Sequence, residues 1–238
     1  MKPNTALLFA LSILLFPPPI RAQPVSTNSV ATSANATAKS DADVEKKAAD
    51  WVASLSLGDS AKETRVKGVI ATHLKAVRDW HNSHPPETVP EGINPVTGKR
   101  LIQLDRQIIA DSAIPKTVHE NLMTGLRKDL SPEQVEAILD KYTVGKVAFT
   151  LKGYHAIVPD LTQEEESTIL GFLKQAREEA VDFKNMNEIS AIFEIYKTKS
   201  EQYLNSRGRD WHALYKSYTD AVRARKAAAT QITNSPAR

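Results

Sequence analysis

The sequence predicts a mainly α-helical protein, a single-domain bundle of about seven or eight helices with a small β-hairpin or loop insert around residues 144–158. Three observations favour this class. Apolar residues recur at three- and four-residue steps through most of the chain, which is the period of a helix with one buried face. Capping-box patterns stand where several of these stretches begin. The insert instead follows the two-residue period of a β-strand.

The N-terminus has the pattern of a secretory signal peptide. Lys2 precedes an apolar run over residues 6–16, and Ala22 offers a small residue for cleavage. Three prolines end the run after eleven residues, whereas a membrane-spanning helix needs about 20. We therefore expect residues 1–22 to be removed and the mature protein to be periplasmic or secreted, with no membrane span.

The rest of the chain divides into a tether, one domain and a tail. Residues 23–40 are mainly Ser, Thr, Ala and Asn, so they bury too little apolar surface to order and should form a flexible tether. No comparable linker interrupts residues 41–229, which predicts one helical domain, and residues 230–238 should be disordered. The chain has no cysteine, so its stability must come from a buried core.

Charge argues against one class of partner. The formal charge of +3 falls to +1 when a leader that contains Lys2 and Arg21 and no acid is removed. Because nucleic-acid binding normally needs a clustered basic face, no nucleic-acid partner is expected. No cofactor is predicted either.

The helices are predicted in order from their apolar stripes and caps. The first covers residues 44–55, and the second begins at a capping box of Ser60 with Glu63 and ends before Pro85. A proline- and glycine-rich loop follows over residues 85–99. The remaining helices are expected at 101–110, 118–126, 132–141, after Thr162, at 188–208 and after Asp210, with two further capping boxes at Ser131–Gln134 and Thr162–Glu165.

The segment Tyr142–Asp160 differs from the rest. Apolar and polar residues alternate over residues 147–152, which favours a strand. A two-residue turn at Lys152–Gly153 would pair two arms of a hairpin and place six apolar residues on one face. These six are Val147, Phe149, Leu151, Tyr154, Ala156 and Val158. We expect this hairpin to pack on the helices.

A ligand site is predicted where the tips of this hairpin would meet the end of the second helix. A tryptophan beside hydrogen-bonding side chains suits a sugar, whose apolar ring face stacks on an aromatic ring while its hydroxyls need polar partners. Core packing is the alternative role for Trp80 and Tyr154. The candidate ligand-binding residues are Arg78, Trp80, His84, Lys152, Tyr154 and His155.

The sequence identifies no catalytic residue and predicts no metal site. His81 and His84 are three residues apart, but Asp79 lies off their face of the helix, so a surface pair near a helix end explains them more simply. The acids Glu164–Glu166 belong to the first turn of a helix, where the macrodipole favours negative charge. The chain also contains no serine elbow, zinc-protease or phosphate-loop motif.

Three long blocks resemble a known family. They are HLKAVRDWHNSHP (73–85), YTVGKVAFTLKGYHAIVPDLT (142–162) and IFEIYKTKSEQYLNSRGRDW (192–211). They are similar to an exported bacterial family, domain-of-unknown-function family 3826, over about residues 49–218. The resemblance implies sugar binding in the company of polysaccharide-degrading proteins, and it implies no catalytic residues.

These observations predict an exported carbohydrate-associated protein that binds oligosaccharide or polysaccharide fragments during polysaccharide utilisation. One alternative is a carbohydrate-active hydrolase or lyase that uses His155 or Tyr154 as acid or base. Another is a periplasmic helical chaperone or stress protein, suggested by LSPEQ at residues 130–134, although a helix start also explains that phrase. The oligomeric state is not predicted.

Overall fold

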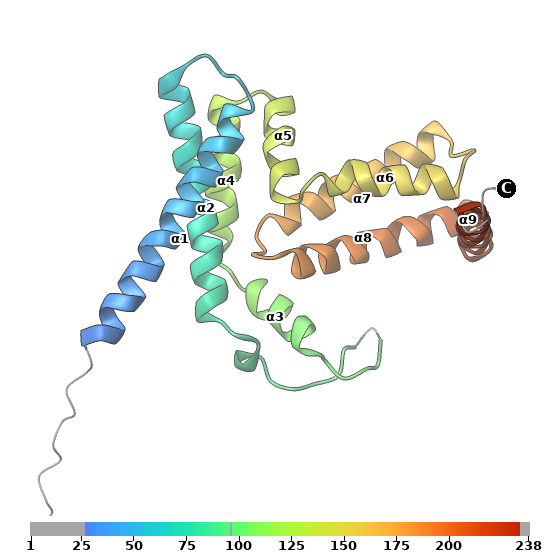
Figure 1. Ribbon diagram of the computed structural model, residues 1–238, viewed down its shortest axis with the longest axis horizontal. Coiled ribbons are helices and arrows are strands. Elements are labelled where there is room, and N and C mark those ends of the chain that lie inside the picture. The colour runs from blue at the N-terminus through green and yellow to red at the C-terminus, as the bar shows by residue number, and fades with distance from the viewer. Residues whose placement is uncertain (1–26, 96, 234–238) are drawn as a thin grey trace, which may run out of the picture. The chain divides into compact units, whose positions relative to one another are not determined.

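The computed structural model describes residues 27–95 and 97–233, and this part of the chain is helical (Figure 1). The chain divides into two units, residues 1–39 and 40–238. The expected signal peptide, residues 1–22, lies outside the described residues. The helices are α1 (Thr27–Ala53), α2 (Ser60–Ser83), α3 (Gln103–Asp111), α4 (Lys116–Asp129), α5 (Pro132–Tyr142), α6 (Lys146–Ile157), α7 (Gln163–Ala180), α8 (Met186–Ser206) and α9 (Trp211–Thr233), with a short 3-10 helix at Pro86–Thr88.

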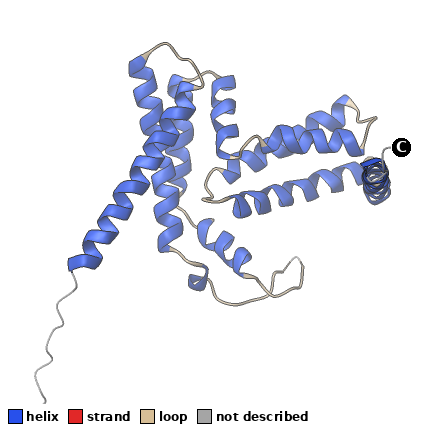
Figure 2. Ribbon diagram, in the orientation of Figure 1, coloured by secondary structure: helices blue, strands red, loops and turns tan. Residues whose placement is uncertain are grey.

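The predicted mainly helical class is confirmed, and the prediction of a β-hairpin is wrong. The described residues form nine α-helices, where seven or eight were expected, and only helices and loops are drawn for them in Figure 2. The first helix begins at Thr27, within the expected tether, whose flexibility stays a prediction. The last helix continues to Thr233, and residues 234–238 lie outside the described part of the chain.

The segment expected as a hairpin is helix α6. Val147, Leu151, Tyr154 and Val158 are spaced by four, three and four residues, which is also a helical stripe, and three of them are buried. Gly145 starts this helix with a positive φ of 67°, which a glycine adopts without steric cost. Phe149, expected on the buried face of the hairpin, is 78% exposed. The apolar residues over 147–152 therefore fit both a strand period and a helical period, and the segment is a helix.

Two of the three predicted capping boxes are confirmed. At α5 the Ser131 side chain accepts from the Gln134 amide, and at α7 Thr162 pairs with Glu165 in the same way. The third prediction is wrong by one residue. Asp59 caps α2, because its Oδ1 accepts from the backbone amides of the next helical residues at 3.0 Å, and Ser60 is the first residue of the helix.

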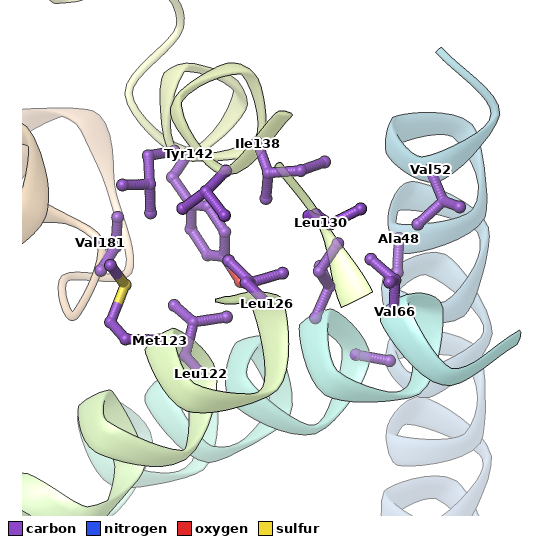
Figure 3. Close-up of a cluster of buried hydrophobic side chains, with 14 residues drawn as sticks. Ala48, Val52, Val66, Leu122, Met123, Leu126, Leu130, Ile138, Tyr142 and Val181 are labelled. Carbon is purple, nitrogen blue, oxygen red and sulfur yellow. The ribbon is translucent and has the colours of Figure 1, made fainter. Parts of the chain in front are cut away.

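Two hydrophobic clusters hold the bundle. The first lies among α1, α2, α4 and α5, and Figure 3 shows Leu126 beside Tyr142, with Ala48 and Val52 of α1 grouped near Val66 of α2. Trp51 of α1 packs edge-on against Tyr142, with ring centroids 4.8 Å apart. Helices α2 and α4 approach closely at Gly125, where an added Cβ would lie 2.6 Å from a methyl group of Val69.

The second cluster lies among α6, α7, α8 and α9. Its fully buried side chains include Ile169 and Leu173 of α7 and Ile192 and Phe193 of α8, and Figure 1 shows α7 running alongside α8. Tyr154 of α6 belongs to the same cluster. Burial of such side chains is the main favourable term in folding. Among the described residues, none of the helices combines the length and apolar character needed to cross a membrane.

Candidate functional site

Three of the predicted site residues lie near the C-terminal end of α2. Trp80 stacks on His84, with ring centroids 3.7 Å apart and an interplanar angle of 16°. The indole Nε1 of Trp80 donates to the carbonyl of Ala110 on α3 at 3.0 Å. The guanidinium of Arg78 is held by Asp41 of α1 at 2.7 Å. These contacts join neighbouring helices, so they give Trp80 and Arg78 structural roles.

The other three predicted residues lie on α6. Tyr154 is buried, and its hydroxyl donates to the Lys197 carbonyl at 3.2 Å. Lys152 is exposed and lines a groove together with Tyr154. His155 instead lies 3.5 Å from the Glu166 carboxylate of α7. The structure therefore does not gather the six residues into one pocket: Trp80 and His84 pack near α3, whereas Lys152 and Tyr154 belong to the groove.

This groove, called the aromatic groove below, is formed by α6, α8 and α9 and has a volume of about 720 Å³. That volume lies within the range of small-molecule sites, about 300–1,000 Å³. The start of α9 is fixed locally, because Asp210 Oδ1 accepts from the Ala213 amide and Gly208 turns the chain with a positive φ of 86°. The lining of the aromatic groove includes Phe149, Lys152 and Tyr154 of α6, Glu194, Lys197 and Glu201 of α8, and Trp211, Tyr215 and Tyr218 of α9.

Aromatic rings dominate the groove. Trp211 and Tyr215 are stacked, with centroids 6.0 Å apart and planes inclined by 27°. The buried ring of Tyr154 contacts Trp211, with ring centroids 5.3 Å apart and planes inclined by 40°. Tyr215 is 50% exposed and Phe149 78% exposed, which is unusual for large apolar side chains that gather in one place. Two ring surfaces are thus available to a ligand.

Charged groups accompany these rings. Lys197 Nζ bridges both carboxylate oxygens of Glu194 at 2.8 and 2.9 Å. Glu201 lies seven residues after Glu194 on the same helix, and burial raises the pKa of its carboxyl, while Lys197 lowers it. With Lys152, the groove contains two lysines and two glutamates. It therefore offers donors and acceptors to hydroxyl groups without a large net charge.

A second hollow, of about 1050 Å³, lies where α7 begins and α9 begins. Four of its charged side chains already form ion pairs with one another or with Asp160. Arg209 contacts Glu165 at 2.7 Å and Asp160 at 2.8 Å, and this guanidinium lowers the pKa of Glu165 to about 2. No aromatic side chain is among its lining residues. The aromatic groove is therefore the stronger candidate for a ligand site.

Most residues of this groove were not among the six predicted from the sequence. Trp211, Tyr215 and Tyr218 recur at steps of four and three residues, so they share a face of α9. The sequence predicts a helix after Asp210, but the spacing alone does not indicate that this face lines a groove. Phe149 was not predicted as a site residue because the expected hairpin put it on the buried face. Glu194 and Glu201 carry no local signal that distinguishes them from other solvated acids of a helix.

The chain was compared with known protein families and with curated proteins. A family model described as "Protein of unknown function (DUF3826)" matches residues 41–224, which is most of the chain and all of α2 to α8. The search among curated proteins finds no match.

Proposed function

The chain belongs to the DUF3826 family, whose description assigns no function, and on this premise we propose that it is an exported bacterial protein that binds glycan fragments in the aromatic groove. The observation that carries the proposal is the stacked pair Trp211–Tyr215, which lines the same groove as the exposed Phe149 together with two carboxylates and two lysines. Sugars bind to such sites because a ring face stacks on the aromatic surface while the hydroxyl groups pair with the polar side chains.

Neutral glycans suit this groove better than acidic ones. Two lysines are balanced by two glutamates, and Lys197 is engaged with Glu194 at 2.8 Å. A polyuronate would place its carboxylates near Glu194 and Glu201, where like charges repel. Paired hydroxyls of a neutral sugar can instead donate to these same carboxylates.

Binding suits the groove better than hydrolysis or lyase chemistry through the residues that the sequence suggested. The hydroxyl of Tyr154 donates to a backbone carbonyl, and burial raises its pKa far above the usual value, so it is poorly placed to exchange a proton at neutral pH. His155 faces Glu166 and is not among the residues that line the groove.

The direct test is calorimetric titration with neutral hexasaccharides of plant and algal glucans, xylans and mannans, with oligo-uronates as the acidic comparison. We expect the wild type to bind a neutral oligosaccharide. Tyr215→Ala should weaken that affinity about tenfold, which corresponds to the loss of about 1.4 kcal/mol of stacking. Phe149→Ala should act in the same direction, because its ring is the most exposed of the set.

Ile195→Ala is the matched control. Ile195 lies on α8 beside Glu194, is 50% exposed like Tyr215, and is not among the groove residues. The Ile195→Ala variant should bind the oligosaccharide with the same affinity as the wild type. The proposal is rejected if no glycan binds, or if binding is unchanged in both the Tyr215 and Phe149 variants while circular dichroism shows them folded. Release of shorter products during the titration would favour the hydrolase or lyase instead.

Export rests on the N-terminal pattern alone. The expected cleavage after Ala22 is tested by N-terminal sequencing of the protein recovered from the periplasm or medium of a bacterium that expresses the full chain. A mature protein that begins near residue 23 is expected. Full-length protein found only in the cytoplasm would remove this part of the proposal.

A further inference from the structure

Three ligand-type side chains from distant parts of the sequence meet between α2, α3 and α8. They are His81 of α2, Asp111 at the end of α3 and Glu188 in the first turn of α8. His81 Nδ1 lies 2.8 Å from Asp111 Oδ2 and 3.6 Å from Glu188 Oε1. All three ligand atoms lie within 4.8 Å of one another. One cation could therefore touch all three after small side-chain movements.

The cluster buries more negative than positive charge. Asp111 and Glu188 are each only 2% exposed. One imidazole faces two carboxyl groups, so the cluster contains more acidic than basic side chains. An unbalanced charge in a buried site is costly, so the arrangement favours an additional cation.

The position of Asp111 adds to this imbalance. It is the last residue of α3, where the helix macrodipole disfavours a negative charge. Lys184, two residues before α8, is engaged elsewhere, because it donates to the Asn82 side chain at 2.6 Å. A cation beside Asp111 would be favoured both by the carboxylate and by the C-terminal end of the helix.

Neutral amides hold both carboxylates in place. Gln107 Nε2 donates to Asp111 Oδ1 at 2.9 Å and also to the His84 carbonyl at 3.1 Å. Asn185 Nδ2 donates to Glu188 Oε1 at 2.7 Å. Because a carboxylate has about four lone-pair sites, each acid keeps acceptor capacity toward His81. Amide support of this kind is what orients metal-binding carboxylates in proteins.

We propose that His81, Asp111 and Glu188 form a binding site for one divalent transition-metal ion, with Zn²⁺ or Mn²⁺ as the ions of choice. One imidazole nitrogen with two carboxylate oxygens suits these ions, whereas Ca²⁺ takes six to eight oxygen ligands. The 2.8 Å separation of Nδ1 from Asp111 Oδ2 places two of the three ligand atoms next to each other already. The site is independent of the aromatic groove and of the function proposed for it.

The test uses the full, untagged chain freed of metal with a chelator. Calorimetric titration with ZnCl₂ and with MnCl₂ should show one strong equivalent. CaCl₂ at the same concentration should bind at least tenfold more weakly. Added Zn²⁺ should also raise the melting temperature, since it binds the folded state.

The near-isosteric variants Asp111→Asn and Glu188→Gln should each weaken Zn²⁺ binding at least tenfold. His155→Gln is the matched control, because it removes another histidine–carboxylate contact, at 3.5 Å, without touching the cluster. In the wild type, substoichiometric Mn²⁺ should broaden the NMR signals of the His81 ring before those of His155. This last measurement does not depend on how well any variant folds.

The proposal is overturned if the wild type shows no strong equivalent for either ion, or if Mn²⁺ broadens His155 first. It is also overturned if both acid variants keep wild-type affinity. Absence of binding together with a more stable Glu188→Gln variant would show that the cluster is an internal ion pair with one carboxylate in excess.

Discussion

Replacing Gly125 by alanine should weaken the packing of α4 against α2. An ideal Cβ at this position would lie 2.6 and 2.8 Å from the two methyl groups of Val69, where ordinary contacts are 3.4–4 Å. Valine has one strongly preferred χ1 rotamer in a helix, so rotation of Val69 cannot clear both methyls. The helices must separate by about 1 Å or distort, which is the kind of overpacking that costs about 1–3 kcal/mol.

The measurement needs a control for helix propensity, because alanine in a helix interior is itself about 1 kcal/mol better than glycine. Gly171 in α7 has no atom within 4 Å of its would-be Cβ, so Gly171→Ala should raise the free energy of unfolding by about that amount. We expect the free energy of unfolding of the Gly125→Ala variant to be about 1–3 kcal/mol lower than that of the Gly171→Ala variant. Urea titrations followed by far-UV circular dichroism measure both values.

A double-mutant cycle identifies the contact. In a Val69→Ala background the methyls are gone, so Gly125→Ala should recover the propensity gain seen at Gly171. The close approach of α2 and α4 would be refuted if Gly125→Ala stabilised the wild type as much as Gly171→Ala does. A deficit that persisted undiminished in the Val69→Ala background would place the strain elsewhere.

Three further predictions follow from ionisable groups and caps. Because Arg209 lowers the pKa of Glu165 to about 2 from the usual 4.5, their ion pair should stabilise the fold above pH 4.5 and be lost as the pH falls toward 2. Glu165→Gln should flatten that part of the stability curve in thermal unfolding, and an unchanged curve would contradict this account. The Asp182 hydrogen bond raises the pKa of His119 above 6.5, so its stabilising effect should be complete below pH 6.5 and disappear as the pH rises through the folded-state pKa. An NMR titration should show this raised value and its decrease in Asp182→Asn, whereas a wild-type value at or below 6.5 is incompatible with the bond. Ser131→Ala should cost about 1 kcal/mol in urea unfolding through loss of the α5 cap, and no cost would mean that the cap is replaced by water.

Most helices could be predicted because their apolar stripes and capping residues lie close together in the sequence. The caps of α5 and α7 lie within four consecutive residues each, so the sequence contains the whole interaction. The α6 segment was ambiguous for a physical reason. Val147, Leu151, Tyr154 and Val158 satisfy a helical stripe, while residues 147–152 also alternate, and packing against α7 and α8 decides between the two.

The sites were harder to predict because they depend on which helices meet. Trp80 and His84 share a helix face, but nothing in their spacing indicates that the face turns toward α3. The proposed cation cluster joins His81 to an acid 107 residues later. A weak signal did exist, since an aspartate at the C-terminal end of a predicted helix opposes the macrodipole and calls for a compensating partner.

The three tryptophans of the chain occupy three different environments, and this distribution has a practical consequence. Trp51 contacts Tyr142 in the first cluster, Trp80 stacks on His84 at the end of the helix that carries His81, and Trp211 stacks on Tyr215 in the groove. Chains that retain one indole each would give separate fluorescence reporters. Emission from Trp80 should respond to movement of the imidazole stacked on it, and emission from the partly exposed Trp211 should shift when water leaves the groove, so local events can be followed without any external dye.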